Sequence, residues 1–128
     1  MIVLDGSALF AILLGEAEAA ACAAVLTEAD PVLLSAGSLA ELLIAATGKD
    51  VLGEMQSLLD GLDPMIVPLT ETRARAAAEA YRKWGKGFHP ARLNLGASFA
   101  YALAKEHDCP LLFVGDDFAK TDVMAARA

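Results

Sequence analysis

The chain has 128 residues, 56% of them hydrophobic and 6% aromatic, which suits one domain, residues 1–128, with helices packed on a small sheet. Its net charge of −7, taken alone, argues against a nucleic-acid partner. No run of about eighteen apolar residues lacks charge, and no basic residue precedes Asp5. The sequence therefore predicts neither a membrane span nor a secretion signal, and we expect a cytoplasmic protein.

The first predicted element is a short buried strand over residues 2–4, which ends at a carboxylate, Asp5. Gly6 makes a tight turn, and a helix is expected over residues 7–14. In open α/β sheets, ligands gather beyond the carboxyl ends of the strands, so Asp5 is a candidate site residue. The alternative is that Asp5 and Ser7 only cap the first helix.

Helical and strand patterns alternate along the rest of the chain, without repeats or linkers. The predicted helices cover residues 16–27, 38–47, 51–62, 71–84 and 95–107, and the predicted strands cover 32–35, 65–68 and 111–114. Thr70 and Asn94 are expected to cap the last two helices, and residues 118–128 to form a short helix or tail. Cys22 and Cys109 lack metal-ligand spacing and are expected to be small buried residues.

This alternation predicts an α/β fold. Strand followed by helix favours a small parallel sheet of about four to five strands, flanked by helices on both faces. The carboxyl ends of parallel strands lie at one edge of the sheet, which is where we expect a functional site.

Carboxylates stand near this edge in three places. Asp5 follows the first strand, Asp116 and Asp117 follow the last, and Glu41 lies one turn into the helix after the second. Carboxylates that share a small volume repel one another unless a cation neutralises them, and Mg²⁺ or Mn²⁺ suits an all-oxygen site. The cluster therefore points to phosphoryl-transfer or phosphodiester chemistry. Glu41 has a structural alternative, because Ser38 and Glu41 fit an S-x-x-E capping box.

Basic residues are concentrated between residues 73 and 92. Up to Glu71 the chain has eleven acids and one base, whereas residues 73–92 hold six bases and one acid. Such a cluster can contact phosphates even in an acidic protein, because salt screens distant charges. A solvated helix face followed by a basic loop, residues 85–90, explains the same pattern without a ligand.

Four stretches of the sequence follow one another in a recognisable order. They are IVLDGSALFAILLGE at the start, SLAE at 38–41, KWGKGFHPARLNLGASFAYALAK at 83–105 and LLFVGDDFAKTD at 111–122. Together they resemble the PIN-domain ribonucleases of the VapC toxin type over nearly the whole chain. The resemblance implies a toxin that hydrolyses RNA phosphodiester bonds with the help of Mg²⁺ or Mn²⁺.

The resemblance also implies which residues bind the metal. Asp5 and Glu41 are two of the four expected acids, and for the acid after the last strand we favour Asp117, with Asp116 second. The third acid belongs in a motif that here reads NLGASF, residues 94–99, and its position is occupied by Ala97. Alanine offers no oxygen, and the neutral Ser98 stands about 100° around the helix. Catalysis is therefore expected to be impaired.

Further roles follow from the resemblance: Ser7 supports Asp5 by a hydrogen bond, and RNA-backbone contacts are made by Lys86, His89 and Arg92. A cognate VapB-type antitoxin is the implied partner. The apolar residues around Leu9, Phe10, Leu13 and Leu14 and the alanine-rich third and fourth predicted helices favour a homodimer. The competing prediction is a PIN domain, inactive by nature or by engineering, that acts as an antitoxin- or RNA-binding module.

Overall fold

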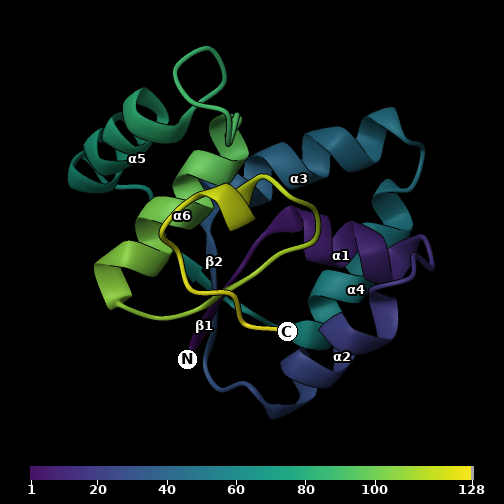
Figure 1. Cartoon of the computed structure of the whole chain (residues 1–128). Coiled ribbons are helices and arrows are strands. Elements are labelled where there is room, and N and C mark those ends of the chain that lie inside the picture. The colour runs from purple at the N-terminus through teal and green to yellow at the C-terminus, as the bar shows by residue number, and fades with distance from the viewer. Residues whose placement is uncertain (128) are drawn as a thin grey trace.

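The computed structural model describes residues 1–127 and shows a central sheet between two layers of helices (Figure 1). The strands are β1 (Ile2–Leu4), β2 (Val32–Ser35), β3 (Met65–Val67) and β4 (Leu111–Leu112). The helices are α1 (Gly6–Leu13), α2 (Ala19–Glu28), α3 (Ala36–Gly48), α4 (Leu52–Leu62), α5 (Glu71–Trp84) and α6 (Leu95–His107), and a 3-10 helix, η1 (Phe118–Lys120), follows β4. Within residues 1–127, none of the helices has the length and apolar character that crossing a membrane requires.

The four strands are all parallel and lie in the order β3-β2-β1-β4. The central strand β1 pairs with β2 through Ile2 and Val32, and with β4 through Leu4 and Leu112. Asp5, at the end of β1, is therefore flanked by the ends of two neighbouring strands. The predicted α/β fold, a small parallel sheet with helices on both faces, is confirmed.

Alternate residues of β1 enter two separate cores. Val3 belongs to the cluster under α5 and α6, whereas Ile2 and Leu4 belong to the cluster under α1, α2, α3 and α4. Both predicted structural cysteines are buried, Cys22 in the second cluster and Cys109 in the first. This alternation is the ordinary pleat of a strand that is covered on both faces, and it fixes the direction in which β1 delivers Asp5.

The helix starts follow the sequence at α5 and α6 but differ at α3. The side chains of Thr70 and Asn94 cap α5 and α6 as predicted. Helix α3 begins at Ala36, because the Ser35 hydroxyl at the end of β2 accepts a hydrogen bond from the Gly37 amide at 3.2 Å. Ser38 is therefore inside the helix, and the predicted start at residue 38 with its capping box is wrong. Helix α2 likewise begins later than predicted, at residue 19.

The segment after β4 is mostly a tail rather than a helix. Beyond η1 the chain returns to the edge of β4, where Leu111 donates a backbone hydrogen bond to Met124 at 2.8 Å and accepts one from Ala126 at 2.9 Å. The tail thus satisfies backbone groups of a strand edge that no further strand covers in the described part of the chain. The last residue of the predicted segment, 128, lies outside the described residues.

The apolar residues of α1 divide between core and surface. Leu9 is fully buried, whereas Leu14, just after the helix, is 49% exposed. The expectation that Leu9 belongs to a homodimer face is therefore wrong, because the helical turn directs this side chain into the core.

Candidate active site

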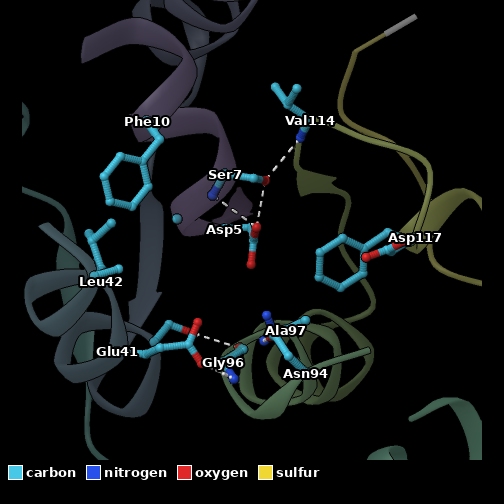
Figure 2. A pocket seen from close by; sticks show the side chains of 14 residues that line it. Asp5, Ser7, Phe10, Glu41, Leu42, Asn94, Gly96, Ala97, Val114 and Asp117 are labelled. Atoms are coloured by element: carbon cyan, nitrogen blue, oxygen red, sulfur yellow. Dashed lines mark hydrogen bonds between the residues drawn. The ribbon is translucent and has the colours of Figure 1, made fainter. Parts of the chain in front are cut away.

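A cavity of about 240 Å³ lies beyond the carboxyl ends of the central strands, among α1, α3 and the start of α6 (Figure 2). Five of the residues that the sequence analysis assigned to the site line it, namely Asp5, Ser7, Glu41, Ala97 and Asp117. The remaining lining residues are mostly apolar or small: Gly6, Phe10, Ser38, Leu42, Ala45, Asn94, Gly96, Val114 and Phe118. The parallel topology thus brings three carboxylates from distant parts of the chain to one opening.

Asp5 is held between the end of β1 and the start of α1. Its Oδ2 atom accepts hydrogen bonds from the Ser7 amide at 3.0 Å and the Ser7 hydroxyl at 2.5 Å. The Ser7 hydroxyl in turn accepts one from the Val114 amide at 3.0 Å, which ties this pair to the chain beyond β4. Asp5 therefore caps α1 and also faces the cavity, so the two interpretations of its sequence position are compatible (Figure 2).

Burial raises the pKa of the Asp5 carboxyl above its usual value. The hydrogen bonds from Ser7 and Gly6 act in the opposite direction, and the charge of Asp117 adds to the rise. Asp5 is only 9% exposed, so water solvates its charge poorly. A cation placed in the cavity would stabilise the ionised form.

Glu41 reaches the cavity from α3 and contacts the start of α6. Its Oε2 atom accepts a hydrogen bond from the Gly96 amide, one of the unpaired donors of the helix N-terminus, where negative charge is favoured. A Cβ atom at position 96 would lie 2.3 Å from the carboxyl atoms of Glu41. Glycine at this position is therefore what allows the Glu41 carboxylate to approach the helix end.

Ala97 occupies the next position of α6 and leaves that wall of the cavity without a carboxylate. Its amide is satisfied by the Asn94 side chain at 2.8 Å, which caps the helix. Figure 2 shows Ala97 on the side of the cavity opposite Asp5, with Glu41 and Asp117 on either side. A carboxylate at position 97 would therefore be a fourth acid lining the cavity.

The chain also matches known proteins along its length. The sequence model of the PIN domain covers residues 2–124. Ribonuclease VapC42 of Mycobacterium tuberculosis is 38% identical over 128 residues, which are 97% of this chain and 98% of that protein. Ribonuclease VapC of Mycolicibacterium smegmatis is 40% identical over 129 residues, with 98% and 99% covered. This chain belongs to the VapC-type PIN-domain ribonucleases.

Solved structures show the same VapC-type fold. The M. tuberculosis toxin VapC20, which cleaves the sarcin-ricin loop, matches with a TM-score of 0.76 and 15% identity over the whole of both chains. FitAcB of Neisseria gonorrhoeae matches with a TM-score of 0.64 and 25% identity over 98% of this chain and 96% of that one. The family predicted from the sequence motifs is confirmed.

Some residues singled out in the sequence lie outside the cavity of this VapC-type chain. Ser98 is fully buried and its hydroxyl donates to the Asn94 carbonyl at 2.9 Å, so it points away from the acids. Asp116 is exposed and does not line the cavity, unlike its neighbour Asp117. The three predicted RNA-binding residues lie on the loop that precedes α6: Lys86, His89 and Arg92.

The oxygen donors of the cavity are of the kind that Mg²⁺ and Mn²⁺ prefer, but they do not make a complete site. Among residues 1–127, no three side chains of His, Cys, Asp or Glu lie close enough together to hold a metal ion. Glu41 is engaged by the Gly96 amide, and Ala97 contributes no oxygen. The residues present therefore offer only an incomplete set of ligands to the divalent ion that the resemblance implies.

Sequence reasoning missed most of the apolar lining of the cavity. On α3 the lining residues are Ser38, Glu41, Leu42 and Ala45, which stand at the i, i+3, i+4 and i+7 positions of one helical face. Once Glu41 is a candidate, this spacing identifies the other three. The contact between Glu41 and Gly96 has no such signal, because it joins two helices that are distant in the sequence.

Proposed function

We propose that this chain is a VapC-like toxin, a metal-dependent endoribonuclease whose hydrolysis of RNA phosphodiester bonds is impaired because position 97 lacks its acid. The observation that carries the proposal is the cavity that Asp5, Glu41 and Asp117 line together with Ala97. Relatives at 38–40% identity are ribonucleases, which supports RNA as the substrate class. Mg²⁺ or Mn²⁺ is the expected cofactor.

In this proposal, residues of the chain hold three carboxylates in place around a negatively charged pocket. Ser7 orients Asp5 through two hydrogen bonds, and Glu41 is fixed against the start of α6. Asp117 is exposed at the opening. Three carboxylates repel an RNA phosphate, so the pocket needs a cation before it can accept its substrate. Without an acid at position 97 that cation is held weakly.

The substitution Ala97→Asp tests this directly. We expect it to strengthen Mn²⁺ binding and RNA cleavage by at least about 10-fold, because the loss of a single group that only orients a metal ligand already costs 10–100-fold. Mn²⁺ binding is measured by calorimetry, and cleavage is followed on a labelled single-stranded RNA. The Ala97→Asn variant is the matched control, since it adds an oxygen of similar size without charge.

Equal Mn²⁺ affinity and equal cleavage by the wild-type chain and Ala97→Asp would show that position 97 is not the site of a missing ligand. Cleavage by Ala97→Asp that an excess of chelator does not stop would contradict metal dependence.

A second candidate function is an inactive PIN domain that binds an antitoxin or RNA. The hydrogen bond between Glu41 and the Gly96 amide favours it, since this carboxylate is already satisfied without a metal. No cleavage by either the wild-type chain or Ala97→Asp, together with retained partner binding, is the outcome that this function predicts.

The proposed function also implies two binding partners, an antitoxin and a second copy of the chain. A VapB-type antitoxin is the expected binding partner, consistent with the toxin–antitoxin complex of Klebsiella pneumoniae, which shares the fold with a TM-score of 0.69. A homodimer is the expected assembly, with exposed apolar residues such as Leu14 and Ile44 as candidates for its surface. A monomer in sedimentation equilibrium at micromolar concentration would contradict the homodimer.

A further inference from the structure

The loop between α5 and α6, residues 85–94, is held by hydrogen bonds and ring packing of its own. Its two ends are joined by backbone hydrogen bonds from Lys86 to Leu93 at 3.0 Å and from Leu93 to Trp84 at 3.1 Å. Inside the loop, the His89 ring accepts a hydrogen bond from the Ala91 amide at 2.9 Å and packs edge-on against Trp84. The loop is therefore closed and internally braced, and Figure 1 shows it projecting beyond α5 and α6.

Phe88 lies on this braced loop and is 65% exposed. Its one ring contact in the described chain is an edge-on approach to Tyr81, with ring centroids 6.0 Å apart. An edge contact leaves a phenylalanine face available to another planar group. Exposure of an apolar ring to water is unfavourable, and the fold does not need Phe88 to be exposed.

The cations near Phe88 differ from those farther along α5. The arginines of α5 pair with carboxylates: Arg73 with Glu106 at 3.1 Å, Arg75 with Glu71 at 2.9 Å, and Arg82 with Glu79. In the described part of the chain, three basic residues on or beside the loop have no carboxylate within ion-pair distance: Lys83, Lys86 and Arg92. Of these, Lys83 lies over the Trp84 ring, 5.1 Å from its centroid. The arginines of α5 are thus paired with carboxylates, whereas Lys86 and Arg92 on the loop are not.

We propose that Phe88 is a stacking platform for an unpaired base of single-stranded RNA, with Lys86 and Arg92 holding the flanking phosphates. This inference rests on the proposed RNA substrate and names a further binding residue for it. An aromatic face between cations is the arrangement that binds single-stranded nucleic acid with little sequence preference. Asn94 ends the loop and lines the cavity, so the loop that carries Phe88 is continuous with the cavity wall.

The alternative occupant of this loop is a protein surface. The observations favour RNA, because the charges of Lys86 and Arg92 would remain poorly compensated against an apolar partner, whereas a nucleic acid supplies one anion per nucleotide. Each cation beside the ring then has a phosphate to neutralise, and the ring has a base of matching shape.

The test measures binding of an end-labelled, unstructured RNA to the full chain by fluorescence anisotropy in the presence of a chelator, so that cleavage does not interfere. Phe88→Ala and Phe88→Leu should each weaken binding about 5- to 100-fold, and Phe88→Trp should restore it, because the aromatic face rather than apolar bulk carries the contact. The salt dependence should stay unchanged in these variants. Lys86→Ala should instead lower the slope of log affinity against log salt by about 0.7.

Two matched controls belong to the same series. Met65→Ala removes an apolar side chain of similar exposure, 57%, at the start of the edge strand β3. Arg75→Ala removes an exposed cation that already pairs with Glu71. Neither should change RNA affinity by more than about 2-fold, in line with the small effect of surface substitutions outside a site.

The possible contrary results separate this inference from the proposed function. If the wild-type chain binds RNA and Phe88→Ala binds it equally well, the stacking role is wrong while the RNA substrate stands. If the wild-type chain binds no RNA, both fail. If Phe88→Ala keeps RNA affinity but loses self-association in sedimentation equilibrium, the loop is a protein contact and the proposal is overturned.

Discussion

At the residue scale, the decisive pair in the cavity is Glu41 and Gly96. The Glu41 carboxylate accepts a hydrogen bond at the N-terminus of α6, and the absence of a Cβ atom at Gly96 leaves space for it. Ala97, one residue on, leaves this arrangement undisturbed because it adds no second negative charge. The part of α6 that lines the cavity therefore has no charged side chain next to the Glu41–Gly96 contact. This contact depends on glycine at position 96.

The Glu41–Gly96 contact should be visible as a coupling energy. Gly96→Ala would drive the carboxylate off the amide, and Glu41→Ala would remove it, so each should lower the free energy of unfolding by about 1–2 kcal/mol. The double variant should cost about as much as one single variant. Urea denaturation measures all three.

Additive losses in that cycle would show that the hydrogen bond contributes nothing of its own. Gly61→Ala is a suitable control, since Gly61 lies in α4 at a position where an added Cβ atom would meet open space. This substitution should be neutral or slightly stabilising, because alanine favours the helix more than glycine does.

At the element scale, helix α6 connects the cavity with α5 and the C-terminal tail. Its first turn walls the cavity, while its middle binds α5 and the C-terminal tail through Tyr101. The Tyr101 hydroxyl accepts a hydrogen bond from the Trp84 indole at 3.0 Å and donates one to the Asp122 carboxylate. Lys105, one turn along α6, contacts the other oxygen of Asp122 at 3.3 Å. This network holds the tail, and with it the segment that carries Asp117.

The Tyr101 network predicts a loss of stability at alkaline pH. Burial and the hydrogen bond to Asp122 raise the pKa of Tyr101 to about 12. An unfolded tyrosine ionises near pH 10, so its contribution to stability is complete below about pH 10 and is lost as the pH rises to about 12. We expect a fall of about 2 kcal/mol over this interval, measured by urea denaturation at each pH.

The Tyr101→Phe variant removes the titrating group. It should be less stable at neutral pH by about 1–2 kcal/mol, because Asp122 and Trp84 lose their partner, and it should show a smaller alkaline loss than the wild-type chain. Parallel curves for the two proteins across this pH interval would contradict the role assigned to Tyr101.

At the scale of the whole molecule, one parallel sheet separates two cores and delivers its strand ends to a single cavity. The central strand β1 is buried on both faces, so Asp5 at its end has a fixed position. Helix α1, which lines the cavity, is positioned by the packing of Leu9 in the core rather than by the exposed residues that follow it. The cavity therefore depends on core packing as much as on its own polar groups.

The packing of α1 can be tested by comparing two leucines. Leu9→Ala should lower the free energy of unfolding by about 2–5 kcal/mol, the usual cost of truncating a buried leucine. Leu14→Ala should change it by no more than about 0.5 kcal/mol. Urea denaturation of both variants decides the matter, and equal effects would mean that Leu9 is not a core residue of the folded protein in solution.

The sequence alone determined the features that arise from local interactions. The alternating pattern predicted a parallel α/β sheet, Thr70 and Asn94 marked two helix starts, and the ordered motifs identified the family and placed Asp5 and Glu41 as candidates. These signals are readable because periodicity and capping involve residues within one turn or one strand of each other. The start of α3 was one local error, beside the start of α2, since Ser35 and Ser38 both offer a capping hydroxyl and only the turn from β2 selects between them.

The tertiary structure alone decided what meets across elements. It placed Glu41 against Gly96, turned Ser98 into the core beside an alanine that lines the cavity, and left Phe88 exposed on the loop that carries Lys86 and Arg92. Each of these depends on how helices pack over the sheet, and no spacing along the chain encodes the distance between two helices. Asp5 could be found from its place at a strand end, but its surroundings required the fold.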